Sequence, residues 1–145
     1  FPPFSQGRSY FLKINLIGGI MMLRLAKNQE LTDIVSDGDM SNPIETQHPI
    51  EGSSVETVVY LFNDDETKRY EDVSVTATDD FDIDESGWIE FSLDGETFSS
   101  SVQIGNVEEA NAGVPITVRV TTPELPETQN KTDIKITVNY TEFAV

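Results

Sequence analysis

The sequence predicts an all-β protein, more specifically an antiparallel β-sandwich with an extended N-terminal arm. Short segments alternate apolar and polar residues, turn residues separate them at intervals of roughly 8–12 residues, and no segment keeps a helical period for more than about two turns. The chain has 145 residues, which is the size of one domain. We therefore expect an arm over residues 1–25 and one sandwich domain over residues 26–145.

The first strands are expected over residues 22–26 and 31–35. An irregular connector follows them, because Ser, Asp, Gly, Asn and Pro recur up to Gly52. After Gly52 the sequence patterns typical of strands become clear. Residues 55–62 are rich in β-branched and aromatic side chains, and residues 73–77 alternate between valine or alanine and serine or threonine. Both patterns predict strands.

The second half of the chain predicts two strand pairs. Residues 88–93 alternate and end at Asp94-Gly95, a dipeptide that favours a hairpin turn, and residues 98–104 form the returning strand. Strict alternation recurs over residues 114–121 and 134–140. The immunoglobulin-like class fits these strands best, without its usual cysteine pair. Trp88 is then expected to pack in the core.

Composition excludes several classes of function. Twenty-six Asp and Glu against nine Lys and Arg give a net charge of -17, so nucleic acids and anionic membranes are not expected as partners. There is no cysteine, and the one histidine, His48, is expected in an exposed loop. Few side chains therefore remain for metal or nucleophilic catalysis, and we expect no enzyme activity.

The charge is unevenly distributed along the chain. Fourteen carboxylates lie between Glu56 and Glu96, whereas residues 1–25 contain no acid and three basic residues, Arg8, Lys13 and Arg24. The sequence thus predicts an acidic domain that faces solvent and a mildly basic arm that faces a partner.

The densest acidic segment, residues 79–85, suggests a calcium site. Asp80, Asp82 and Asp84 stand at alternate positions, and carboxylate oxygens are the ligands that calcium prefers. The helix–loop–helix calcium template is not met, since Glu85 stands where that template requires glycine. The hypothesis is therefore a calcium site in a β-loop.

The alternative is a solvated loop that holds no metal. In that interpretation Phe81 and Ile83 point inward and the aspartates face water. Calcium is the one cofactor that the sequence suggests, and no other is expected.

The first twenty residues have two interpretations. In one, they form an arm that adds a strand to a neighbouring subunit. The apolar residues offered to that partner are Phe4, Tyr10, Phe11, Ile14 and Leu16. In the other, the codons of Gly18-Gly19 form a ribosome-binding element, and the native chain starts at Met21 or Met22.

Two segments carry a resemblance to a known class of proteins. Residues 55–77 read VETVVYLFNDDETKRYEDVSVTA, and the last strand pair reads GVPITVRVTTPE and TDIKITVNYTE. These segments resemble the small immunoglobulin-like structural proteins of tailed-bacteriophage virions, over about residues 30–145. The resemblance implies a non-enzymatic decoration protein. It would stabilise a capsid or tail by contacts with other virion proteins, as a homo-oligomer or in many copies.

Similar strand sequences occur in bacterial cell-surface β-sandwich modules. The alternative function is therefore an adhesion or carbohydrate-binding module on a bacterial surface, with calcium held by Asp80, Asp82 and Asp84. The two functions predict different locations, the virion and the cell surface.

Overall fold

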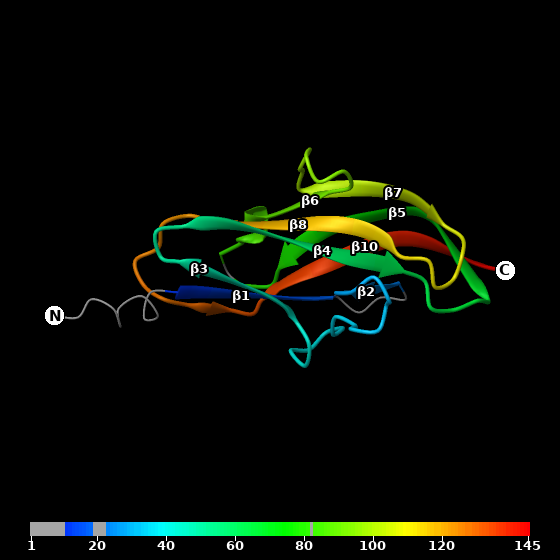
Figure 1. The fold of residues 1–145 in the computed structure, drawn as a ribbon, viewed down its shortest axis with the longest axis horizontal. Helices are drawn as coiled ribbons and strands as arrows, with labels where there is room; N and C mark the ends of the chain where they lie inside the picture. The colour runs from blue at the N-terminus through cyan, green and yellow to red at the C-terminus, as the bar shows by residue number, and fades with distance from the viewer. Residues whose placement is uncertain (1–10, 19–22, 82) are drawn as a thin grey trace.

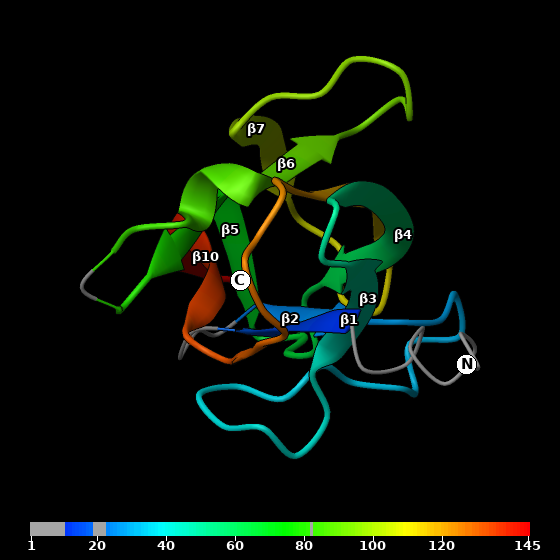
Figure 2. The ribbon, with the colours of Figure 1, turned by 90° about the vertical axis from the view of Figure 1, so that its left-hand side faces the viewer.

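A computed structural model describes residues 11–18, 23–81 and 83–145 of the chain. Two β-sheets enclose one apolar core, which confirms the predicted all-β, two-sheet architecture (Figures 1 and 2). In chain order the elements are β1 (Phe11–Gly18), β2 (Arg24–Ala26), β3 (Ile44–Pro49), β4 (Ser53–Phe62), β5 (Lys68–Asp79), the 3-10 turn η1 (Ser86–Trp88), β6 (Ile89–Ser92), β7 (Ser101–Val107), β8 (Val114–Thr122), β9 (Asn130–Lys131) and β10 (Ile134–Ala144).

The first sheet is mixed. Its strand order is β3-β1-β10-β5-β7, and the short strand β9 also pairs with β1. Strand β1 runs parallel to β10 and β9, whereas the other neighbours in this sheet are antiparallel. The predicted sandwich is therefore antiparallel except around β1, which is a correction to the sequence-based expectation.

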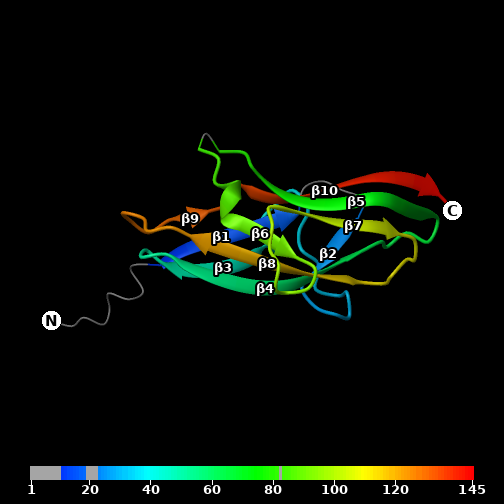
Figure 3. The same cartoon turned by 90° about the horizontal axis from the view of Figure 1, so that it is seen from above.

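The second sheet, β2-β4-β8-β6, is antiparallel throughout its described strands (Figure 3). Val59 of β4 lies opposite Ile116 of β8, and both side chains are buried. Along β8, buried residues alternate with less buried ones, as the period of two predicted. Strands β5, β8 and β10 overlap residues 73–77, 114–121 and 134–140, which were predicted as strands from their alternation.

Strand β1 is built into the core of its own domain. Leu12, Ile14 and Leu16 are fully buried, and six residues of the strand pair with β3. Ile14 and Leu16 were expected in an arm that contacts a partner, and that prediction is wrong because both side chains lie in the core of their own domain. Alternating apolar residues did predict a strand, but the sheet that receives it belongs to the same chain. Phe4 and Tyr10 lie outside the described residues, as do Met21 and Met22.

Two further expectations fail between β2 and β4. Residues 31–35 form no strand and contribute one isolated bridge, Ile34 to Ala26. Residues 44–49, expected as an irregular connector, form β3. The inward positions of β3 after Ile44 are Thr46 and His48, so polar residues interrupt the apolar alternation.

Trp88 packs against the core from η1, as predicted, and is partly buried. Across the described ranges, no helix is long and apolar enough to cross a membrane.

Candidate functional site

A loop that we name the acidic loop, residues 79–86, joins the end of β5 to η1. In the end-on view it extends away from the two sheets (Figure 2). Its sequence, Asp-Asp-Phe-Asp-Ile-Asp-Glu-Ser, combines the densest acid of the chain with two large apolar residues. Asp82 lies outside the described residues.

Asp79 organises the acidic loop from its base. Its Oδ1 accepts a hydrogen bond of 2.9 Å from the backbone N–H of Phe81, and its Oδ2 accepts one of 2.8 Å from the backbone N–H of Glu85. Carboxylates that bond to nearby backbone amides favour turns over continued strand. Asp79 therefore ends β5 and fixes the path of the loop.

Lys131 joins the loop to β9. Its Nζ lies 2.9 Å from Asp79 Oδ2 and 3.1 Å from Glu85 Oε1, and we name these three residues the Lys131 cluster. The side chain of Lys131 is 4% exposed and that of Asp79 is 0% exposed, so the pair is shielded from water. The ring of Phe81 lies above the amine, with 4.9 Å between Nζ and the ring centroid.

Burial and hydrogen bonding act in opposite directions on this pair. Burial alone raises the pKa of Asp79, but the hydrogen bonds from the Phe81 and Glu85 amides and from Lys131 outweigh it and lower that pKa. Burial alone lowers the pKa of Lys131, but its bonds to Asp79 and Glu85 raise it above the ordinary value. The resting pair is therefore an ion pair that holds the base of the loop.

The outer part of the loop presents apolar side chains to solvent. Phe81 is 54% exposed and Ile83 is 67% exposed. The interpretation in which both side chains point inward is wrong. The chain turns at Asp79, so the alternation of β5 does not continue into the loop.

Asp80 and Asp84, the two predicted calcium ligands that the structure describes, bond to different groups. Asp80 Oδ2 lies 2.7 Å from Lys135 Nζ, and Asp84 Oδ1 accepts a bond of 2.9 Å from the Ser86 backbone. Within the part of the chain that the structure describes, no group of three metal-binding side chains is found. Since Asp82 lies outside that part, the calcium site stays a prediction.

His48 is buried in β3, so the prediction of an exposed loop histidine is wrong. Its Nε2 lies 2.9 Å from Thr46 Oγ1, and its Nδ1 lies 2.9 Å from Ser53 Oγ. Burial lowers the pKa of His48 below its ordinary value, against a smaller raising effect of Ser53. The neutral imidazole thus satisfies two hydroxyl groups at the inner face of β3.

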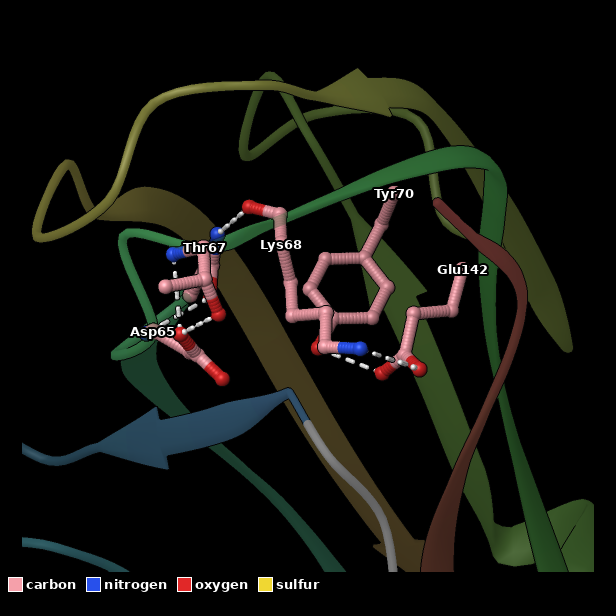
Figure 4. A network of polar contacts seen from close by, with 6 residues as sticks. Asp65, Thr67, Lys68, Tyr70 and Glu142 are labelled. Carbon is pink, nitrogen blue, oxygen red and sulfur yellow. Dashed lines mark hydrogen bonds and ion pairs between the residues drawn. The ribbon is translucent and has the colours of Figure 1, made fainter. Parts of the chain in front are cut away.

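A second polar cluster lies at the opposite end of the β5–β10 strand pair (Figure 4). The Tyr70 hydroxyl donates to Glu142 Oε1 at 3.0 Å, and Lys68 Nζ lies 3.6 Å from Glu142 Oε2. We name Lys68, Tyr70 and Glu142 the Glu142 cluster. Beside it, Asp65 Oδ1 accepts hydrogen bonds from the Thr67 backbone and hydroxyl, which close the turn before β5.

Sequence reasoning missed the Lys131 cluster. One signal was present for Asp79, because it follows Val73, Val75 and Ala77 at the inward-facing period of β5 and is therefore an acid at a core position. Lys131 carries no such signal, since it stands in a polar stretch and its strand has only two residues.

The chain matches no protein-family model, and no similar sequence is found among the curated proteins. The resemblance to virion proteins therefore stays a prediction.

Proposed function

We propose that this chain is a non-enzymatic structural protein that decorates or stabilises the capsid or tail of a tailed-bacteriophage virion by protein–protein contact. The observation that carries this proposal is the acidic loop, which presents Phe81 and Ile83 to solvent on a base held by buried contacts. Exposed apolar side chains grouped in this way are typical of interaction surfaces.

The physical argument concerns affinity. Burying a large apolar side chain contributes about 1.5–3 kcal/mol, so Phe81 and Ile83 together can anchor one contact. A loop whose base is already fixed loses little conformational entropy when it binds, which leaves more of that free energy for association.

Charge indicates the kind of partner surface. Asp80 and Asp84 flank the apolar pair, and the whole chain carries a net charge of -17. An apolar pocket rimmed by Lys and Arg on another virion protein complements the loop. This contact surface replaces the N-terminal arm of the sequence analysis, because Ile14 and Leu16 belong to the core.

The immunoglobulin-like assignment is part of the same proposal. Two facing sheets and the β4–β8 pairing support it. The parallel pairing of β1 with β10 departs from the antiparallel pattern of that class.

The test is made on particles of the virus whose genome encodes the chain. Wild-type chain is expected in purified particles at a fixed copy number, and Phe81→Ser with Ile83→Ser is expected to remove most of it. The matched control is Leu93→Ser, which changes an exposed apolar residue in a different loop and should leave the copy number unchanged. Absence of wild-type chain from the particles contradicts the proposal.

Calcium separates this proposal from the cell-surface alternative. In the structure Asp80 bonds to Lys135 and Asp84 to Ser86, so each carboxylate already has a partner. We therefore expect calcium to leave the melting temperature unchanged. A calcium-dependent rise in the melting temperature favours the adhesion module instead.

A further inference from the structure

The Lys131 cluster combines three groups that the proposed contact surface does not use. A lysine amine and two carboxylates lie together where Asp79 and Lys131 have almost no contact with water. Nζ touches Oδ2 of one carboxylate and Oε1 of the other. An amine held against a carboxyl group in a shielded site forms a buried ion pair, and once neutral it can also act as a nucleophile.

We propose that Lys131 and Asp79 condense after folding to an intramolecular amide, with Glu85 as the residue that carries the proton. The product is a covalent cross-link between the end of β5 and β9. This modification goes beyond the proposed function and does not depend on it.

The step is balanced without any added reagent. One proton of the Lys131 ammonium passes to Asp79 Oδ2, which gives a neutral amine and a neutral carboxylic acid. Nζ then forms a bond to Cγ, Glu85 takes a second proton from Nζ and delivers it to Oδ2, and the Cγ–Oδ2 bond breaks. Oδ2 leaves as water with the electron pair, one hydrogen stays on the amide nitrogen, and Glu85 returns to its carboxylate form.

The geometry supplies what each part of this step requires. Glu85 Oε1 is 3.1 Å from Nζ, within the distance for direct proton transfer. The Phe81 backbone N–H bonds to Asp79 Oδ1, which becomes the oxyanion of the tetrahedral intermediate. Holding amine and carboxyl group in contact replaces an unfavourable encounter between separate molecules.

Burial favours the reactive protonation state. The neutral amine and neutral acid are disfavoured in water, but a water-poor site weakens the preference for two charges. Hydrogen bonds still hold the resting pair ionised, since the pKa of Asp79 is lowered and that of Lys131 is raised. Condensation is therefore expected to be slow and to follow folding.

A neighbouring ion pair provides the internal comparison. Lys135 Nζ lies 2.7 Å from Asp80 Oδ2, which is closer than the reactive pair, but both side chains are substantially exposed. Water stabilises their charges, and among the described residues Lys135 forms an ion pair with Asp80 alone. Lys135 is thus expected to remain a free amine, so that proximity without burial does not produce the cross-link.

The consequence of the cross-link is mechanical. The bond closes a loop of about fifty residues and acts as a disulfide does in other small domains, by restricting the unfolded chain. The sequence contains no cysteine and therefore no disulfide, whereas an amide between Lys131 and Asp79 can form from side chains that the chain does contain. It also fixes the base of the acidic loop to β9.

Intact-mass spectrometry of the purified full-length chain tests the proposal. We expect most of the wild-type protein to be lighter than its sequence mass by one water, about 18 Da, with the lighter form growing after refolding. Lys131→Arg keeps the positive charge but lacks the amine nucleophile and is expected at full mass. Lys135→Arg is the matched control and should keep the loss. Glu85→Gln should slow it.

Peptide mapping locates the bond. Trypsin should yield peptide 70–119 joined to peptide 120–135, because the modified Lys131 is no longer cleaved. A wild-type chain that keeps its full mass after long incubation overturns the proposal. So does a loss of water confined to peptide 70–119, which indicates cyclisation at Asp94-Gly95 instead. Neither result involves a virion partner.

Discussion

The two ends of the β5–β10 strand pair each have an ion pair, but the two pairs differ in burial. At each end a lysine contacts a carboxylate from another part of the chain. In the Lys131 cluster the ionic pair is almost completely buried, whereas in the Glu142 cluster the side chains of Lys68 and Glu142 are 33% and 31% exposed. Water therefore competes for the charges of Lys68 and Glu142 but not for those of Lys131 and Asp79.

Burial decides what each cluster contributes. Exposed ion pairs contribute about 0–1 kcal/mol, because solvent screens them, while breaking a buried pair costs about 3–5 kcal/mol. The Lys131 cluster also receives two backbone amides, so it shapes the acidic loop as well as pairing charges. The Glu142 cluster mainly satisfies the hydroxyl of the buried Tyr70.

Asp79→Ala should show the largest effect. It leaves the buried ammonium of Lys131 without its closest partner, so the free energy of unfolding should fall by about 4 kcal/mol. The measurement is urea denaturation at neutral pH, with freshly refolded wild-type chain of full sequence mass as the reference, so that the ion pair and not the proposed amide is compared.

Glu142→Ala is the matched change at the other end and should cost about 1 kcal/mol, since its carboxylate is partly solvated. Equal losses from the two substitutions contradict the distinction between the ends.

Ile14→Ala should lower the free energy of unfolding by about 3 kcal/mol, because it leaves a cavity in the core. Ile14 lies opposite Lys131 in the β1–β9 pairing, so this change should loosen the Lys131 end before the Glu142 end. Lys13→Ala, at the neighbouring and partly exposed position, is the control. Loss of stability no larger than in this control would show that β1 is not part of the core.

Tyr70→Phe should cost only about 1 kcal/mol. The ring stays in the core and keeps its edge-on contact with Tyr140, and one hydrogen bond to Glu142 is lost. Thermal unfolding of the variant measures this cost. A loss of stability as large as that of Asp79→Ala would show that the Glu142 cluster contributes as much as the Lys131 cluster, which contradicts the distinction between the ends.

An alkaline titration should reveal the Glu142 cluster without any effect at neutral pH. Burial, and then the bond to Glu142, raise the pKa of Tyr70 well above its ordinary value of 10.0. The folded state holds this proton more tightly than the unfolded state, so the stability from Tyr70 is complete below about pH 10 and falls as the pH rises.

Tyrosinate absorbance provides the readout. The chain has four tyrosines, and Tyr70 is expected to ionise only as the protein unfolds. The late-ionising component should disappear in Tyr70→Phe. Ionisation of all four tyrosines near pH 10 in the folded protein contradicts the burial of this hydroxyl.

The sequence predicted the strands whose core positions are apolar. Residues 73–77, 114–121 and 134–140 are examples, because a strand between a core and solvent must alternate. It failed where the core position is polar. Thr46 and His48 face inward on β3, and the imidazole bonds to Thr46 and Ser53, which no hydropathy pattern reveals.

The candidate site was less predictable for a similar reason. The apolar residues Phe11, Ile14 and Leu16 predicted an extended segment that adds a strand to a sheet, but a pattern along one strand does not say which sheet receives it. The acidic segment was recognised as unusual, yet the outward direction of Phe81 depends on a turn fixed by Asp79. Lys131 reaches that carboxylate from β9, a contact between distant parts of the sequence.

Amide hydrogen exchange at Phe81 tests the central claim most directly, because its N–H bonds to Asp79 Oδ1, an oxygen that both the ion-paired and the amide-linked forms keep. We predict that this amide exchanges far more slowly than that of an unstructured peptide in the wild-type chain, and that Asp79→Ala removes this protection. Exchange at unstructured rates in the wild-type chain would contradict an acidic loop held by the Lys131 cluster.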